Sequence, residues 1–135
     1  IFTIGQALDT GLVTPDSIID TRGPMTWGRF RLSDFSNYGP ELSVTDVIVK
    51  SSNIGTVRIA LQIGPTAQRA FLESLGFLRP TTVEMAEAPA GTPLLPRDWS
   101  EISLMTISYG HGLSDSPLHL AAGYASMVNG GTLVT

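Results

Sequence analysis

The sequence predicts a mainly α-helical fold with long loops and few short strands. Apolar residues recur at helical spacing in several segments, and residues that favour helix starts and stops flank these segments. Residues 77–98 are instead rich in proline, which is typical of a loop, and these prolines are Pro80, Pro89, Pro93 and Pro96. The chain has 135 residues, which is enough to bury one hydrophobic core.

The first predicted helix covers residues 1–10, because Ile1, Ile4 and Leu8 share one stripe and Gly11 provides a stop. No capping residue stands before this helix, although helices usually begin with Ser, Thr, Asp or Asn. The last residues, 130–135, resemble a turn that leads into a strand. We therefore expect the chain to be the middle of a longer protein.

Two short helices are predicted on either side of Ser51-Ser52. Ser43 is a suitable cap for the first helix, and Asp46 stands three residues later, at the spacing of a capping box. The second helix covers residues 53–62 and ends at Gly64, because its apolar residues line one face up to that glycine. The segment between them must break the helical path.

The remaining elements are also predicted from local signals. Pro65 begins a helix, and its expected inner residues are Ala67, Ala70, Phe71 and Leu75. Residues 99–107 are apolar and helical at their start. Ser116-Pro117 begins the last helix, whose expected packing stripe is Leu118, Ala121, Ala122, Ala125 and Val128. Alternation over residues 27–32 predicts one short strand.

The composition excludes several classes of function. The 8 Lys and Arg against 12 Asp and Glu give a formal net charge of −4, which argues against a nucleic-acid partner. There is no cysteine, so disulfides, thiolate ligands and cysteine nucleophiles are excluded. The two histidines, His111 and His119, stand eight residues apart and make a poor zinc site, and no phosphate-binding glycine loop occurs. We therefore expect no metal and no cofactor.

The strongest candidate for chemistry is Ser51-Ser52-Asn53, which lies between two predicted helices. A hydroxyl can relay a proton, and an Asn amide offers one acceptor and two donors, which suits binding to a peptide bond. The same residues also suit a helix break with an N-cap at Ser52 or Asn53. The pattern by itself leaves both interpretations open, because a Ser-x-Asn sequence is common by chance.

The segment Lys50-Ser51-Ser52-Asn53-Ile54-Gly55 resembles the second motif of class B penicillin-binding proteins, the transpeptidases that cross-link peptidoglycan. Further stretches resemble this family in the same order along almost the whole chain: Phe2-Thr3, Ala7-Leu8, Ile19-Asp20-Thr21, Glu87, Pro96, Trp99, Tyr109-Gly110-His111-Gly112, Pro117-Leu118 and Asn129-Gly130-Gly131. The Gly-His-Gly variant is most similar to the division-specific, septal branch.

This resemblance implies an α/β, serine β-lactamase/transpeptidase-like fold for the parent, with residues 1–135 as part of the transpeptidase domain. It implies that Ser51 shuttles a proton, that Asn53 holds the substrate amide and the catalytic lysine, and that Ser52 is structural. The family also needs a Ser-x-x-Lys motif with the nucleophile and a Lys-Thr-Gly motif. Neither occurs in this sequence, where Lys50 is the single lysine, so we expect the chain alone to be inactive.

For the parent protein, the resemblance implies peptidoglycan stem peptides as substrates, β-lactams as ligands and division-complex proteins as partners. It also implies an inner-membrane anchor and a periplasmic catalytic domain. Two alternatives stay open: a serine β-lactamase, and a penicillin-sensing or division-partner-binding module. Charged residues make up 15% of the chain, below the average of about 25%, so we also expect an exposed apolar face and self-association of this segment.

Overall fold

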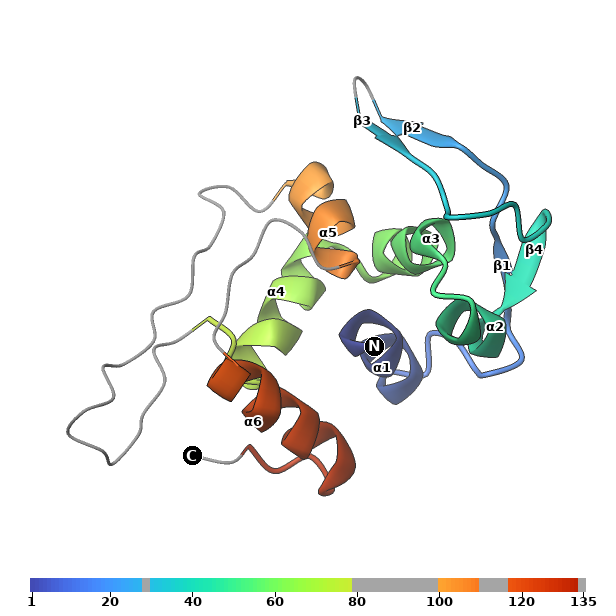
Figure 1. Cartoon of the computed structure of the whole chain (residues 1–135). Coiled ribbons are helices and arrows are strands. Elements are labelled where there is room, and N and C mark those ends of the chain that lie inside the picture. Colours follow the sequence, from blue (N-terminus) through green and yellow to red (C-terminus); the bar gives the residue numbers. More distant parts are fainter. Residues whose placement is uncertain (28–29, 79–99, 110–116, 134–135) are drawn as a thin grey trace.

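The computed structural model describes residues 1–27, 30–78, 100–109 and 117–133 (Figure 1). The helices are α1 (Phe2–Asp9), α2 (Val44–Val49), α3 (Asn53–Ile63), α4 (Pro65–Ser74), α5 (Glu101–Ser108) and α6 (Pro117–Val128). The strands are β1 (Ile18–Asp20), β2 (Met25–Trp27), β3 (Phe30–Leu32) and β4 (Glu41–Ser43). Helices predominate and each of these strands has 3 residues, so the predicted class is confirmed.

Several features singled out in the sequence lie outside the described residues. They are the proline-rich stretch from residue 79 onward with Glu87, Pro96 and Trp99, the turn at 110–112 with His111, and Ser116. Among the described helices, none is long and apolar enough to cross a lipid bilayer.

The strands form two antiparallel pairs, whereas the sequence pattern predicted one short strand. β1 pairs with β4, with Ile19 opposite Leu42, and β2 pairs with β3, with Trp27 opposite Phe30. The prediction of one strand over 27–32 is therefore wrong, because this run contains the end of β2 and all of β3. Alternation along the chain looks the same whether it belongs to one strand or to two strands that pair.

The helix boundaries follow local capping chemistry. The Ser43 hydroxyl accepts a hydrogen bond from the Asp46 backbone N–H at 3.2 Å, so Ser43 caps α2 as predicted. α3 ends at Gly64, whose φ of 87° lies in the region that favours glycine, and Pro65 is the first residue of α4. The predicted stop and start at this junction are confirmed.

α3 is the central element, and it contacts α1, α2, α4, α5 and β1 (Figure 1). One core cluster joins α1, α2 and the β1–β4 pair to α3, and it consists of Ile4, Ala7, Val13, Ile19, Leu42, Val44, Val47 and Ile59. A second cluster joins β3 to α3 and α5 through Leu32, Ile54, Val57 and Met105. The third lies at the end of α4, and it consists of Leu72, Leu75 and Phe77.

Two helices bury faces that differ in part from those predicted. Leu75 is buried and Phe71 packs against it, as predicted for this helix, but Ala67 and Ala70 are exposed, and Gln68 and Leu72 of α4 are buried instead. From residue 119 onward in α6, His119, Gly123 and Ser126 are the buried positions, and Val128 is 86% exposed. Gly123 permits the close approach of Phe77, because a Cβ there would lie 2.6 Å from the Phe77 Cζ. Contacts between helices, rather than small apolar residues, decide these faces.

Candidate active site

The junction between α2 and α3 presents the Ser-Ser-Asn segment. Helix α2 ends at Val49 with Lys50 as its C-cap, and the backbone N–H groups of Ser51 and Ser52 donate to the carbonyl oxygens of Ile48 and Val47, at 3.1 and 3.0 Å. Ser51 has a φ of 54°, and among the described residues it is the one non-glycine position with positive φ. A serine rarely adopts this backbone conformation, which is associated with functional sites when the surrounding structure enforces it.

Ser52 faces into the fold instead of the solvent. It is 1% exposed, and its hydroxyl oxygen accepts a hydrogen bond from the Gly55 N–H at 3.0 Å, so it is the N-cap of α3. The same hydroxyl donates to the Asp34 carboxylate at 2.7 Å. Asn53, the next residue, is the first residue of α3 and is half-buried.

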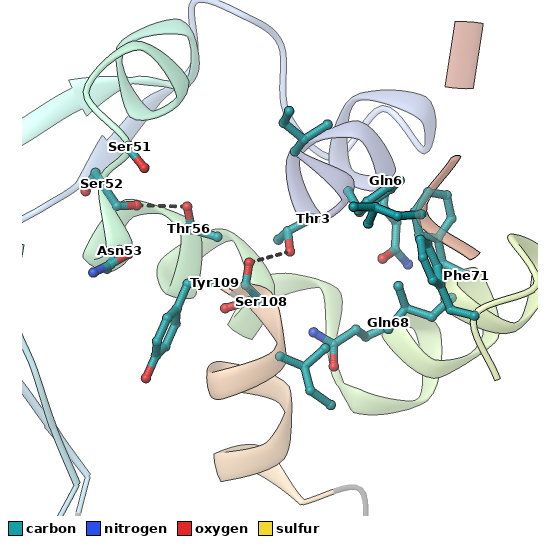
Figure 2. Close-up of a pocket in the computed structure, with 16 residues that line it drawn as sticks. Thr3, Gln6, Ser51, Ser52, Asn53, Thr56, Gln68, Phe71, Ser108 and Tyr109 are labelled. Carbon is teal, nitrogen blue, oxygen red and sulfur yellow. Dashed lines mark hydrogen bonds between the residues drawn. The ribbon is translucent and has the colours of Figure 1, made fainter. Parts of the chain in front are cut away.

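Ser51 and Asn53 both line a cavity of about 570 Å³ (Figure 2). Its described lining residues are Ile1, Phe2, Thr3, Gln6, Ser51, Ser52, Asn53, Thr56, Gln68, Phe71, Leu72, Phe77, Ile107, Ser108, Tyr109 and Leu120. Figure 2 shows the three motif residues at one end of the pocket and Gln68 and Phe71 at the other. The structure thus brings Ser51 and Asn53 to one cavity, whose volume is in the range of small-molecule sites.

Polar side chains that cross between helices hold the walls of this pocket together. The Thr3 hydroxyl of α1 donates to the Ser108 carbonyl of α5 at 3.1 Å (Figure 2). The Gln6 amide of α1 donates to the Ala67 carbonyl of α4 at 2.9 Å, and the Gln68 amide of α4 donates to the Leu104 carbonyl of α5 at 3.0 Å. These bonds fix the relative positions of three helices, because a buried amide without a partner is costly.

Sequence reasoning missed these lining residues. Gln6 and Gln68 are both buried, and each stands among apolar residues of an amphipathic helix. A long polar side chain at a position of the buried face is the one signal that could have identified them, because such a group needs a specific partner. Thr3 and Ser108 give no comparable signal in the sequence.

The described lining of the pocket carries no Asp, Glu, Lys, Arg or His side chain. Lys50 adjoins the motif, but its ammonium nitrogen lies 5.4 Å from the centre of the Tyr38 ring and the residue does not line the pocket. Burial raises the pKa of the Tyr109 hydroxyl, which therefore stays protonated at neutral pH. Within the described ranges, no three His, Asp or Glu side chains gather as a metal-binding cluster.

The described lining residues can bind a peptide-like group. Ser51 supplies a hydroxyl, Asn53 supplies an amide with donors and an acceptor, and the aromatic side chains of Phe2, Phe71 and Phe77 supply apolar surface. No general base lies among the described lining residues, so acyl transfer at this site needs further groups.

Comparison with known proteins places the whole chain in one family. The penicillin-binding protein transpeptidase domain family matches residues 1–135. The chain is 35% identical over 132 residues to a protein of Caulobacter vibrioides named "Probable peptidoglycan D,D-transpeptidase FtsI", and 31% identical over 121 residues to "Peptidoglycan D,D-transpeptidase FtsI" of Escherichia coli K12. These matches cover 98% and 90% of the chain, but only 22% and 20% of the relatives.

Solved structures agree with the sequence matches. A structure described as a peptidoglycan glycosyltransferase from Burkholderia ambifaria superposes with a TM-score of 0.86 and 34% identity, covering 98% of this chain and 42% of that one. The transpeptidase domain of penicillin-binding protein 3 from Burkholderia pseudomallei superposes with a TM-score of 0.85 and 33% identity, covering 98% and 40%. The chain belongs to the penicillin-binding protein transpeptidase domain family.

Proposed function

We propose that this chain forms one wall of the acyl-transfer pocket of a peptidoglycan D,D-transpeptidase, which cross-links peptide stems and is acylated by penicillin. The observation that carries the proposal is that Ser51 and Asn53 line one cavity together with Ser52, which is 1% exposed and caps α3. The names of the relatives support the same activity and favour it over a serine β-lactamase.

In this proposal Ser51 transfers a proton between the catalytic lysine and the leaving amine. Asn53 holds the amide of the substrate and orients that lysine, and Ser52 has a structural role. The positive φ of Ser51 supports this role, because unfavourable backbone conformations of this kind cluster at functional sites. Peptide stems and β-lactams both contain amide groups. The Asn53 side-chain NH₂ can donate a hydrogen bond to a carbonyl oxygen of the ligand, and its oxygen can accept one from an N–H.

We further propose that residues 1–135 are part of a larger transpeptidase domain, whose other segments supply the nucleophile and its base. Two observations support this division of labour. The chain spans 22% of the Caulobacter vibrioides relative, and the described lining of its pocket has no base. Acyl transfer needs a nucleophile, a base and an oxyanion hole, so the pocket requires these groups from elsewhere.

The parent protein is proposed to act in cell division, with an inner-membrane anchor, a catalytic domain in the periplasm and partners in the division complex. Self-association of the isolated segment is also proposed. It is supported by the apolar side chains of Leu120, Tyr124 and Val128, which stand at helical spacing on α6 and are 45%, 40% and 86% exposed.

Labelling of the full-length protein with a fluorescent penicillin tests the proposed function. The protein should form a stable covalent adduct, whereas the isolated chain of 135 residues should stay unlabelled. A slow rate of adduct hydrolysis is expected for a transpeptidase, and rapid turnover of penicillin would instead indicate a β-lactamase. A full-length protein that forms no adduct would contradict the proposal.

A further inference from the structure

We propose that Asp34 is a positioning residue, which fixes the start of α3 and thereby the side chains of Ser51 and Asn53. This inference rests on the proposed function. One carboxylate oxygen of Asp34 accepts a hydrogen bond from the Ser52 hydroxyl at 2.7 Å, and the other accepts from the Ile54 backbone N–H at 2.9 Å. Asp34 is not one of the described residues that line the pocket. It therefore acts through the start of α3, to which it is hydrogen-bonded.

The β2–β3 hairpin positions Asp34 at the start of α3. Leu32, the last residue of β3, is 6% exposed and packs with Ile54 and Val57 of α3. Asp34 stands two residues after Leu32, so the packing of the hairpin against α3 sets the position of the carboxylate. The backbone segment with Asp34 is thus anchored on the same helix whose N-terminus it binds.

The hydrogen-bond inventory of Ser52 explains why a carboxylate is suited to this position. The Ser52 hydroxyl has a single proton, which it donates to Asp34, while its oxygen accepts from the Gly55 N–H at 3.0 Å. In this arrangement Asp34 accepts one hydrogen bond at each of its two oxygens, which a carboxylate can do. Its negative charge also interacts favourably with the N-terminal end of the α3 dipole.

The constraint falls on the residues that flank Ser52. Ser51 keeps a φ of 54°, which is unfavourable for serine and persists only where the surrounding structure enforces it. Asn53 lies between the two groups that Asp34 binds, Ser52 and Ile54. Loss of this carboxylate would leave the side chains of Ser51 and Asn53 on a less constrained backbone, and small displacements of reacting groups have large effects on rate.

The test is the rate of acylation by fluorescent penicillin in the full-length protein, measured over a range of penicillin concentrations. Asp34→Asn retains one acceptor oxygen for the Ile54 N–H but cannot accept the Ser52 proton if the amide NH₂ replaces that oxygen. The maximal acylation rate should fall by about tenfold to a hundredfold. The half-saturating concentration should change much less, because the remainder of the pocket is intact.

Ser43→Ala is the matched control, because it removes an equivalent cap from the neighbouring helix α2. This variant should leave the maximal acylation rate within about twofold of the wild-type rate, although it removes a similar capping bond. Equal losses in Asp34→Asn and Ser43→Ala would overturn the proposal, because general loosening of the fold would then explain both. An unchanged rate in Asp34→Asn would also overturn it.

A second test compares the acylation rates of Ser52→Ala, Asp34→Asn and the double variant that combines them. If Asp34 acts through Ser52, the double variant should be no slower than the slower single variant, whereas full additivity would overturn the proposal. If both single variants fail to fold while Ser43→Ala folds, Asp34 is a requirement of the fold and the proposal is wrong. A wild-type protein that is not acylated, or a Ser51→Ala variant acylated at the wild-type rate, identifies failure of the proposed function itself.

Discussion

The starts of α2 and α3 use the same cap but different partners. In both, a serine hydroxyl accepts a hydrogen bond from a backbone N–H three residues later, Ser43 from Asp46 and Ser52 from Gly55. The backbone N–H of Thr45, two residues after the α2 cap, donates to the carbonyl oxygen of Pro15 at 3.1 Å. The corresponding group at the start of α3 is Ile54, and it donates to the Asp34 carboxylate.

This difference shows how one helix start becomes part of a site while the other remains part of the fold. At the start of α2, carbonyl oxygens of a loop accept hydrogen bonds from the first backbone N–H groups of the helix. This helix start does not line the cavity. At α3, a charged side chain holds both the cap and the helix, and the residues on either side of the cap line the cavity. We therefore infer that the same capping chemistry supports the proposed site only at α3, where a distant residue adds a further constraint.

The largest expected effect is that of Ser51→Ala on acylation of the full-length protein by penicillin. Loss of a proton-relay hydroxyl should slow acylation by about 10²- to 10⁴-fold, or about 3–5 kcal/mol in barrier height. Thermal stability should change little, because the side chain is exposed and alanine has the same difficulty as serine at positive φ. An acylation rate equal to that of the wild type would remove Ser51 from the mechanism.

The second expected effect is on stability and compares the two caps directly. Ser43→Ala should lower the free energy of unfolding by about 1 kcal/mol, the usual value of an N-cap. Ser52→Ala should cost about 2–3 kcal/mol, because it removes a cap and also leaves a half-buried Asp34 oxygen without its partner. Chemical denaturation of both variants measures the difference, and equal costs would show that the Asp34 bond adds nothing.

Asn53→Ala is expected to weaken recognition more than chemistry. The amide side chain lines the cavity, and loss of its hydrogen bonds to a ligand should raise the half-saturating penicillin concentration by an amount equivalent to about 1–2 kcal/mol. Gln62→Ala serves as the control, because Gln62 is an exposed amide on the same helix that does not line the pocket. If both variants bind penicillin equally well, Asn53 has no role in recognition.

The sequence predicted the features of this site that depend on neighbouring residues. Ser43 as a cap, Gly64 as a stop and Pro65 as a helix start all follow from the preferences of short segments, and the structure confirms them. The motif resemblance likewise identified Ser51 and Asn53 as candidates, and these residues do share a cavity. Their assigned roles stay predictions.

The remaining features depend on contacts between distant residues, which periodicity does not encode. Strands β1 and β4 are stabilised by pairing with each other and are too short to give a pattern. Gln68 is buried in α4 because its amide reaches the Leu104 carbonyl on α5. Asp34 has no local sequence signal that links it to Ser52, and the packing of the β2–β3 pair against α3 brings the two residues together.

The smallest expected effect is that of Ser51→Gly on stability, and Ser52→Gly is its comparison at the adjacent serine. Ser51→Gly should leave the free energy of unfolding unchanged or raise it by up to about 1 kcal/mol, because relief of the positive φ outweighs the entropy of glycine in the unfolded chain. Ser52→Gly should destabilise, because φ is −71° there and the hydroxyl bonds to Asp34 and Gly55 are lost. Ser51→Gly should nevertheless acylate as slowly as Ser51→Ala. If Ser51→Gly is more stable but acylates slowly, the backbone at Ser51 is strained and the hydroxyl is needed for acylation. If Ser51→Gly is less stable, the backbone conformation at Ser51 is not strained.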